Sequence, residues 1–267
     1  QGTTVTIPAN AFVTQANAPV AGMVTVQFLD IYKKSDMLLA NMPTTNGYGG
    51  PPLKSGGEFF IKAIQANAPL LLAPGKNITV AQPASLTGGG DTLNPQQAFI
   101  ADIVFPCSGS GPGPGSGPCL GEWSWTPTTA DSVNTFANNY IFTMYQFNTP
   151  ADSGSWCNSD NSSYFSAYPQ TQLTLLANDS VNIYGTNIFL AFKNLSSMVH
   201  VYHYGHRYFP YNYAPQGLQC TAVAVGIKNG QVYSAFIPIT IGANQTVPFT
   251  LSPTTTSSFT TQLQALN

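Results

Sequence analysis

Short runs that alternate between apolar and polar residues dominate this sequence. In the run MVTVQFLDIY, Val24, Val26 and Phe28 fall on one face and the polar residues between them on the other, which is the period of a half-buried strand. Further strand-like runs occupy residues 3–7, 59–63, 99–105, 172–176, 187–193, 198–204 and 246–251, and residues 140–147 indicate a strand with both faces covered. Because these runs are separated by turn residues and do not alternate with helical patterns, they predict an all-β fold built from β-sandwiches.

Two local signals near the end of the chain are more specific. Asn229-Gly230 stands between the alternating runs AVAVGIK and QVYSAFIPITI, and both central residues of a type I′ turn need positive φ. This pair predicts a hairpin. Phe259, Leu263 and Leu266 have helical spacing, so we expect a short helix from about Ser257.

The segment 106–119, PCSGSGPGPGSGPC, interrupts the β pattern. Its Gly, Pro and Ser residues sustain neither a helix nor a paired strand. We therefore expect one domain at 1–105, a linker at 106–119, and a second domain at 120–267.

The 4 cysteines are even in number, which favours disulfides and an oxidising compartment. A bridge between Cys107 and Cys119 would close the linker and contribute about 3 kcal/mol on the chain-entropy model. Cys157 and Cys220 would then join within the second domain. The alternative, a zinc site, is disfavoured because no Cys-x-x-Cys spacing occurs.

Composition narrows the range of partners. Charged residues make up 7% of the chain, against about 25% in a typical soluble protein, but 43% hydrophobic residues suffice for a core. A net charge of −2 excludes a basic surface for nucleic acid, and no apolar run is long enough to span a bilayer. Because the chain begins directly in strand-like sequence, we expect a mature extracellular or cell-surface protein whose signal peptide has been removed.

Three motifs in the first hundred residues carry a family resemblance: IPANAF at 7–12, the pair DIY and DML within 30–38, and SGGEFFIKA at 55–63. In this order they resemble the amino-terminal module of uncharacterised two-domain surface proteins and lipoproteins of Bacteroidetes, which is similar to the ZU5 β-sandwich. The resemblance implies a scaffolding or adhesion role. Some ZU5 proteins cleave themselves at His-Phe-Ser, and this sequence is absent here.

The segment HVYHYGHRYFPYNY, residues 200–213, is the most unusual in the chain. It holds His200, His203 and His206, but on a strand the middle histidine points away from the other two, so the spacing disfavours a metal site. Its aromatic side chains instead suit packing or partner contact, and the alternative is stacking on sugar rings. The candidate contact residues are Trp123, Trp125, Tyr202, Tyr204, Arg207, Tyr208, Tyr211 and Tyr213.

The acidic residues suggest no enzyme. Asp152 and Asp160 lie in a polar stretch that we interpret as a solvated loop, although it has oxygen ligands that suit calcium. Glu58 and Glu122 have no visible partner for paired-carboxylate hydrolysis. We find no nucleophile elbow, phosphate loop or dinucleotide motif, and predict no catalytic residue, cofactor or metal.

These observations favour a structural or adhesive protein that contacts copies of itself or another surface protein. Exposed edge strands at either end of the chain would allow pairing with a neighbour, and the candidates are residues 1–7, with Thr3, Val5 and Ile7, and residues 246–251. A carbohydrate-binding module is the alternative function, and a hydrolase is the third.

Overall fold

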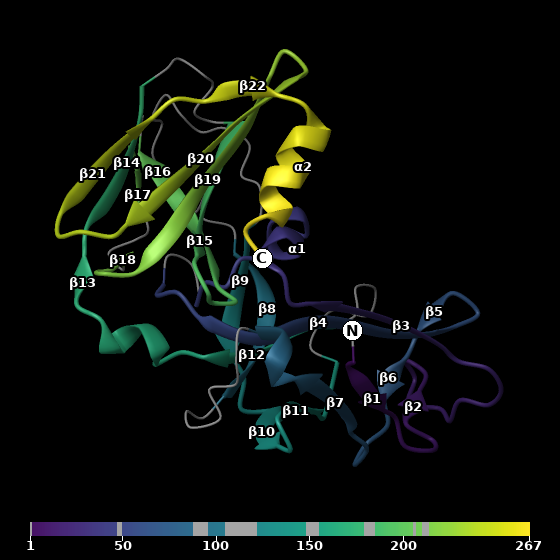
Figure 1. Ribbon diagram of the computed structural model, residues 1–267. Helices are drawn as coiled ribbons and strands as arrows, with labels where there is room; N and C mark the ends of the chain where they lie inside the picture. The colour runs from purple at the N-terminus through teal and green to yellow at the C-terminus, as the bar shows by residue number, and fades with distance from the viewer. Residues whose placement is uncertain are drawn as a thin grey trace, which may run out of the picture. The chain divides into compact units, whose positions relative to one another are not determined.

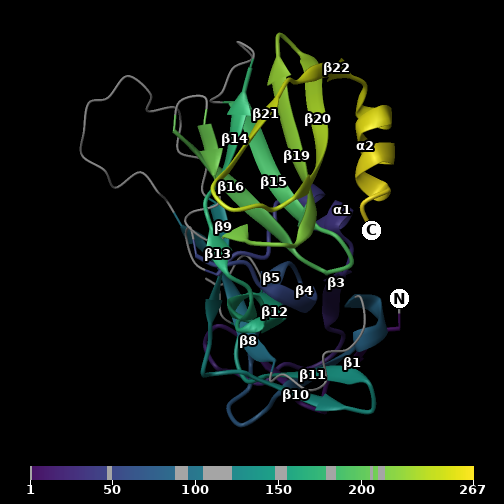
Figure 2. The same ribbon diagram turned by 60° about the vertical axis from the view of Figure 1, so that its left-hand side comes forward.

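The computed structural model describes residues 2–46, 50–87, 96–104, 122–147, 155–178, 185–204, 207–209 and 214–267, and it confirms an all-β fold (Figures 1 and 2). In the described residues, two short α-helices, α1 (Lys34–Leu39) and α2 (Thr256–Gln264), and two 3₁₀ turns, η1 (Ala84–Thr87) and η2 (Tyr164–Ala167), accompany the strands. No helix within these ranges is long and apolar enough to cross a membrane.

The chain divides into two compact units, and each is interrupted in sequence. Unit 1 comprises Gln1–Tyr32, Ser55–Ala101 and Trp125–Asn161, and unit 2 comprises Lys33–Lys54, Asp102–Ser124 and Ser162–Asn267. The division therefore lies elsewhere than the predicted boundaries at 105 and 120. The reason is strand pairing between distant segments, which local sequence patterns do not reveal.

Unit 1 contains a four-stranded antiparallel sheet, which we call the terminal sheet. Its order is β1 (Thr4–Thr6), β7 (Ile78–Pro83), β11 (Asn139–Met144) and β10 (Ser132–Phe136), so β1 and β10 are its edges. Alternate residues of β7 and β11 are buried, as their period-2 patterns require.

The second large sheet of unit 1 runs in the order β3 (Thr25–Ile31), β4 (Lys54–Gln65), β12 (Ser155–Asn161), β8 (Gln97–Val104) and β9 (Glu122–Pro127), with β5 (Ala68–Pro69) paired to β4. A small sheet pairs β2 (Phe12–Val13) with β6 (Leu71–Leu72). Phe59 and Ile61 of β4 pack with Val80 of β7 and Phe142 of β11 in one core. The two larger sheets thus face each other as a sandwich.

Unit 2 is built on an eight-stranded sheet. Its order is β21 (Gln245–Phe249), β14 (Leu173–Ala177), β17 (Arg207–Phe209), β16 (Met198–Tyr204), β15 (Thr186–Phe192), β19 (Gln219–Lys228), β20 (Gln231–Thr240) and β22 (Ser252–Thr254). A separate pair joins β13 (Gln170–Thr171) to β18 (Ala214–Pro215). Segment 33–54 belongs to this unit because the Thr44 N–H donates to the Met198 carbonyl at 2.6 Å, and the Met198 N–H donates to Thr44 Oγ1 at 2.8 Å.

The hairpin predicted at Asn229-Gly230 is confirmed. These residues have φ values of 51° and 78° and connect β19 to β20, whose pairing runs from Lys228 opposite Gln231. Ala137 and Asn138, with φ values of 47° and 62°, connect β10 to β11 in the same way. That turn has no glycine, so no comparable turn signal marks it in the sequence.

The C-terminal helix is also confirmed. Thr255 caps α2 by accepting a hydrogen bond from the Ser258 N–H at 3.1 Å. The apolar face of the helix buries Phe259 and Leu263 against Val223 of β19 and Phe236 of β20, which is the arrangement that their helical spacing predicts. Figure 2 shows α2 alongside β20.

Candidate functional site

The terminal sheet holds the first set of predicted contact residues, at its β1 edge. Thr3 is fixed there because its hydroxyl donates to Asp30 Oδ2 at 2.7 Å and lies 2.6 Å from the Tyr32 hydroxyl. Val5 and Ile7 are half-buried and pack against the core of unit 1. Only β7 pairs with β1 among the described strands, so the opposite side of β1 is a sheet edge (Figure 1).

In the register of the terminal sheet, residues of similar chemistry lie opposite one another and form rows across all of its strands. On the core side, Val5 stands opposite Val80, Val80 opposite Phe142, and Phe142 opposite Val133. On the outer side, hydroxyl residues form an adjacent row from one edge to the other: Thr6, Thr79, Thr143 and Ser132. Both rows therefore end in similar side chains at the two edges.

No charged residue occurs in any strand of the terminal sheet, whose sequences are TVT, ITVAQP, NYIFTM and SVNTF. Asp131, which directly precedes β10, is buried and accepts a hydrogen bond from the Tyr145 N–H at 2.9 Å. It therefore does not present its charge at that edge. Edge strands usually avoid unwanted pairing through charge or proline, and β1 and β10 carry neither.

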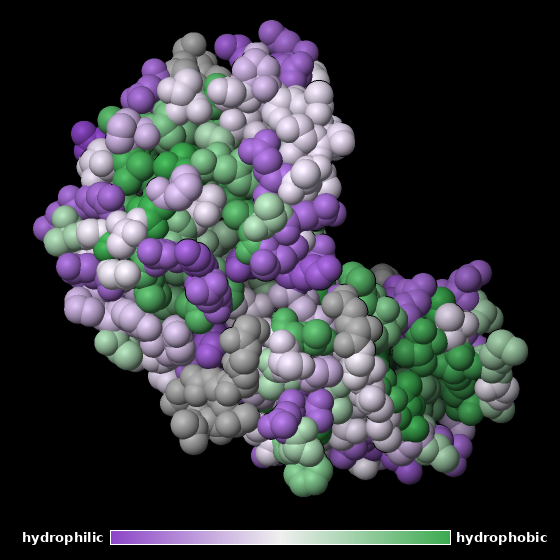
Figure 3. Space-filling view, viewed as in Figure 1, coloured by the Kyte–Doolittle hydropathy of each residue, from purple (hydrophilic) through white to green (hydrophobic). Residues whose placement is uncertain are grey.

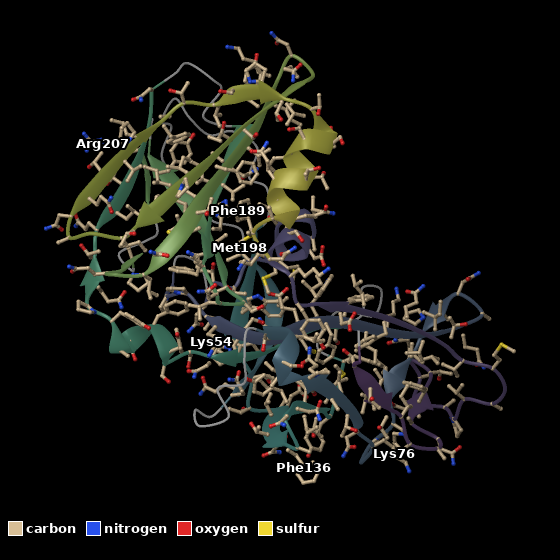
Figure 4. All side chains as sticks on the ribbon, viewed as in Figure 1. Lys54, Lys76, Phe136, Phe189, Met198 and Arg207 are labelled. Atoms are coloured by element: carbon tan, nitrogen blue, oxygen red, sulfur yellow. The ribbon has the colours of Figure 1, made fainter. Side chains whose placement is uncertain are left out.

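Hydrophobic side chains also reach the surface of unit 1. Phe136 lies at the end of β10 with 74% of its surface exposed, at the tip of the β10–β11 hairpin (Figure 4). Figure 3 shows further hydrophobic residues gathered over β2, β3 and β6, where Phe12, Phe28 and Leu72 pack only partly into the core. Exposed apolar surface thus lies at the end of the uncharged β10 edge and over β2, β3 and β6.

The second predicted edge strand, at residues 246–251 in unit 2, differs from β1 and β10 because it contains a proline. Strand β21 lies at one side of the eight-stranded sheet and pairs in parallel with β14, so residues 246–249 of the predicted strand 246–251 lie at a sheet edge. This edge contains Pro248, however, and the opposite edge strand β22 contains Pro253. Proline removes a backbone donor from an edge strand and limits its pairing.

The predicted aromatic contact surface is in part wrong. Trp125 and Tyr208 are each only 1% exposed, and the Tyr208 ring packs edge-on against Phe249 at 6.0 Å between centroids. Both rings fill cores, so neither is available for stacking on a sugar. Arg207 is exposed, as Figure 4 shows. The side chains of Trp123, Tyr202 and Tyr204, and residues Tyr211 and Tyr213 entirely, lie outside the described structure.

The histidine segment begins on β16, where the His200 ring packs edge-on against Phe189 with 5.1 Å between centroids. The His203 side chain and His206 lie outside the described part of the chain. Within the part that is described, no group of three or more His, Cys, Asp or Glu side chains is placed to hold a metal ion.

The predicted bridge between Cys157 and Cys220 is wrong. Both thiols are free and buried, Cys157 in the core of unit 1 and Cys220 in the core of unit 2. Burial raises the pKa of the Cys220 thiol to about 12 and raises the pKa of Cys157 well above its usual value, so neither is a thiolate at neutral pH. Cys107 and Cys119 lie outside the described residues.

Cys220 also lines a pocket of about 420 Å³ in unit 2, between β15, β19, β20 and the C-terminal Leu266. The charged residue that lines it is Lys193, whose Nζ donates to Gln219 Oε1 at 3.1 Å. A protonated thiol and a lysine that is engaged with an amide do not form an activated nucleophile.

A buried polar cluster in unit 1 was not predicted from the sequence. Glu58 on β4 and Asp160 on β12 are both fully buried, and Asn158 Nδ2 donates to Asp160 Oδ2 at 2.8 Å. Ser55 Oγ in turn donates to Asn158 Oδ1 at 2.8 Å. Asp160 therefore lies on a strand and not, as the sequence suggested, in a solvated loop.

The two carboxyl groups of this cluster favour their protonated forms. Burial raises the pKa of Glu58 well above its usual value, and the neighbouring Asp160 raises it further. Burial likewise raises the pKa of Asp160, although hydrogen bonds from Ser55 and Asn158 oppose the rise. Since both groups are inaccessible to solvent, this pair is suited to structure and not to hydrolysis of an external substrate.

No known protein-family model matches the chain, and no curated protein matches it significantly.

Proposed function

We propose that this protein is a non-enzymatic structural or adhesive protein that acts outside the cell or at its surface and associates with copies of itself through strand edges. The observation that carries the proposal is the uncharged, proline-free pair of edges of the terminal sheet, β1 and β10. An edge strand with unpaired backbone groups and no protecting charge favours pairing with another chain.

The chemistry of the described residues supports a role without catalysis. The paired acids Glu58 and Asp160 are sealed from solvent, and the Cys220 thiol beside the pocket has a raised pKa. The low charge of the whole surface, from a chain with 7% charged residues, also provides little repulsion between copies.

Carbohydrate binding has less support than it had from the sequence. It relied on exposed aromatic rings, and Trp125 and Tyr208 are buried. We therefore do not propose it as a second function.

Sedimentation velocity of the purified chain over a hundredfold range of concentration tests the proposal. We expect the weight-average sedimentation coefficient to rise with concentration, and elongated particles to appear by negative-stain electron microscopy at the highest concentration. Monomer throughout the range, with no such particles, would contradict self-association. Because ionic repulsion is small, we expect the association to change little between low and moderate salt.

A further inference from the structure

Each of the two rows of side chains in the terminal sheet runs from the β1 edge to the β10 edge. Because each row ends in similar residues at both edges, the pattern suggests how two copies meet. The core-side row ends in Val5 on β1 and Val133 on β10, and both valines are half-buried. The outer row ends in Thr6 and Ser132, which both carry hydroxyl groups. If one edge met the other, valine would lie beside valine and hydroxyl beside hydroxyl.

Strand direction permits this meeting. All neighbours in the terminal sheet are antiparallel, and the sheet has 4 strands, so β1 and β10 run in opposite directions. A second copy in the same orientation therefore presents its β1 antiparallel to the β10 of the first. Antiparallel pairing would continue across the junction without any reversal.

We propose that β10 of one copy pairs with β1 of a second copy, head to tail, with Val133 opposite Val5 and Ser132 opposite Thr6. The proposal rests on the self-association proposed above and names its interface. The partner is another copy of this chain because its β1 edge carries a valine and a hydroxyl residue in the register that continues the rows of β10. Since the two surfaces differ, each copy keeps one edge free, and the contact can repeat.

The energetic gain comes from the two half-buried valines. A strand paired beside β1 would cover Val5, which is half-exposed because no described strand lies beyond it. The same junction would cover Val133 on the other copy. Removing this apolar surface from water while the free N–H and C=O groups of both edges pair is the general basis of strand addition.

Cysteine pairing between separately prepared variants tests the register. Thr6→Cys and Ser132→Cys are each expected to stay uncrosslinked alone under mild oxidation, apart from any background seen with the unmodified chain. An equimolar mixture of the two is expected to give a disulfide-linked dimer. Thr6→Cys mixed with Gln231→Cys, an exposed residue at the start of β20 in unit 2, is the matched control and should give none.

The possible results separate the inference from the function on which it rests. A linked dimer from Thr6→Cys alone would show β1 pairing with β1, and one from Ser132→Cys alone would show β10 pairing with β10. Either result overturns the head-to-tail contact but leaves self-association intact. No linkage in the mixture, from a chain that still associates by sedimentation, would overturn the interface alone. A chain that neither links nor associates overturns both proposals.

Charge placed on the core side of the edge provides a second test. Val5→Lys and Val133→Lys should each weaken association at least about tenfold, because the junction would bury an unpaired ammonium that each monomer leaves near solvent. Val247→Lys is the matched control, since Val247 is also a half-buried valine at the middle of an edge strand, β21. If circular dichroism shows that Val5→Lys and Val133→Lys are folded and their association is unchanged, the proposal is contradicted. A loss of association in Val247→Lys alone would place the contact at β21.

Discussion

Replacing Glu58 by glutamine should make the free energy of unfolding depend less on pH and should increase it at neutral pH. The native state raises the pKa of Glu58 through burial and the nearby Asp160, so it retains a proton that the unfolded chain releases. Stability from this group is therefore complete below the unfolded pKa of about 4.3 and falls as pH rises from there towards the raised native value. Glutamine keeps the shape of the side chain and never ionises.

The size of the effect follows from linkage. Each proton that the native state alone retains changes the free energy of unfolding by about 1.4 kcal/mol per pH unit. In the pH range where the native state keeps a proton on both Glu58 and Asp160 and the unfolded state keeps neither, the free energy of unfolding of the wild type should fall by up to about 2.7 kcal/mol per pH unit. Glu58→Gln should reduce this slope by about half. The two proteins should be nearly equal at pH 4, and the variant should be the more stable at pH 7.

Urea unfolding at intervals between pH 4 and pH 8 measures this difference. Two of the chain's three tryptophans, Trp125 and Trp156, belong to unit 1, so tryptophan fluorescence reports chiefly on the unit that contains the pair. Glu58→Asp is the control, because it keeps a carboxyl group at this position and should keep the wild-type slope despite the shorter side chain. A Glu58→Gln variant with the wild-type slope, or one that is less stable than wild type at pH 8, would show that the folded protein does not hold Glu58 protonated above pH 4.

Two further substitutions test local features of the fold. Gly57→Ala should destabilise unit 1 by about 2–4 kcal/mol in urea unfolding, because φ is +124° and an added Cβ would lie 2.5 Å from Gln82 Nε2 and 2.6 Å from Tyr32 Cε1; a loss below about 0.5 kcal/mol would show that the site relaxes. Thr255→Ala should lower the stability of unit 2 by about 1 kcal/mol through loss of the bond from the Ser258 N–H, and Thr255→Ser should retain it.

Many of the strands, and the turn at Asn229-Gly230, were predictable because their signals are local. The alternation in MVTVQFLDIY became β3, the Asn229-Gly230 pair became the β19–β20 turn, and the helical spacing near the C-terminus became α2. Even the position of β1 at a sheet edge was anticipated. Each of these features depends on residues that are close together in the chain, so period and turn chemistry are sufficient to reveal them.

The make-up of the two units could not be predicted in this way. Strand β12, with the sequence SWCNSDN, reads as a polar loop, but it pairs with β8 inside unit 1 and buries Asn158, Ser159 and Asp160. Partners distant in sequence hydrogen-bond several of its polar groups: Ser55 Oγ donates to Asn158 Oδ1, and Ser159 Oγ donates to Gln82 Oε1 at 3.2 Å. The pattern of apolar and polar residues along the chain contains no information about hydrogen-bond partners that are distant in sequence.

Several of the few charged residues of this protein are buried, and the edge strands of its terminal sheet have none. Among the chain's 8 basic and 10 acidic residues, the buried ones include Lys34, Lys54, Glu58, Asp131 and Asp160. Charged side chains are rarely buried, so their retention inside a chain with so few of them leaves the surface even less charged than its composition suggests. Lys34 illustrates this, since its Nζ donates to the Phe192 carbonyl at 3.1 Å. Because charge is what ordinarily protects a free strand edge, the edges β1 and β10 of the terminal sheet, whose strands contain no charged residue, are open to pairing.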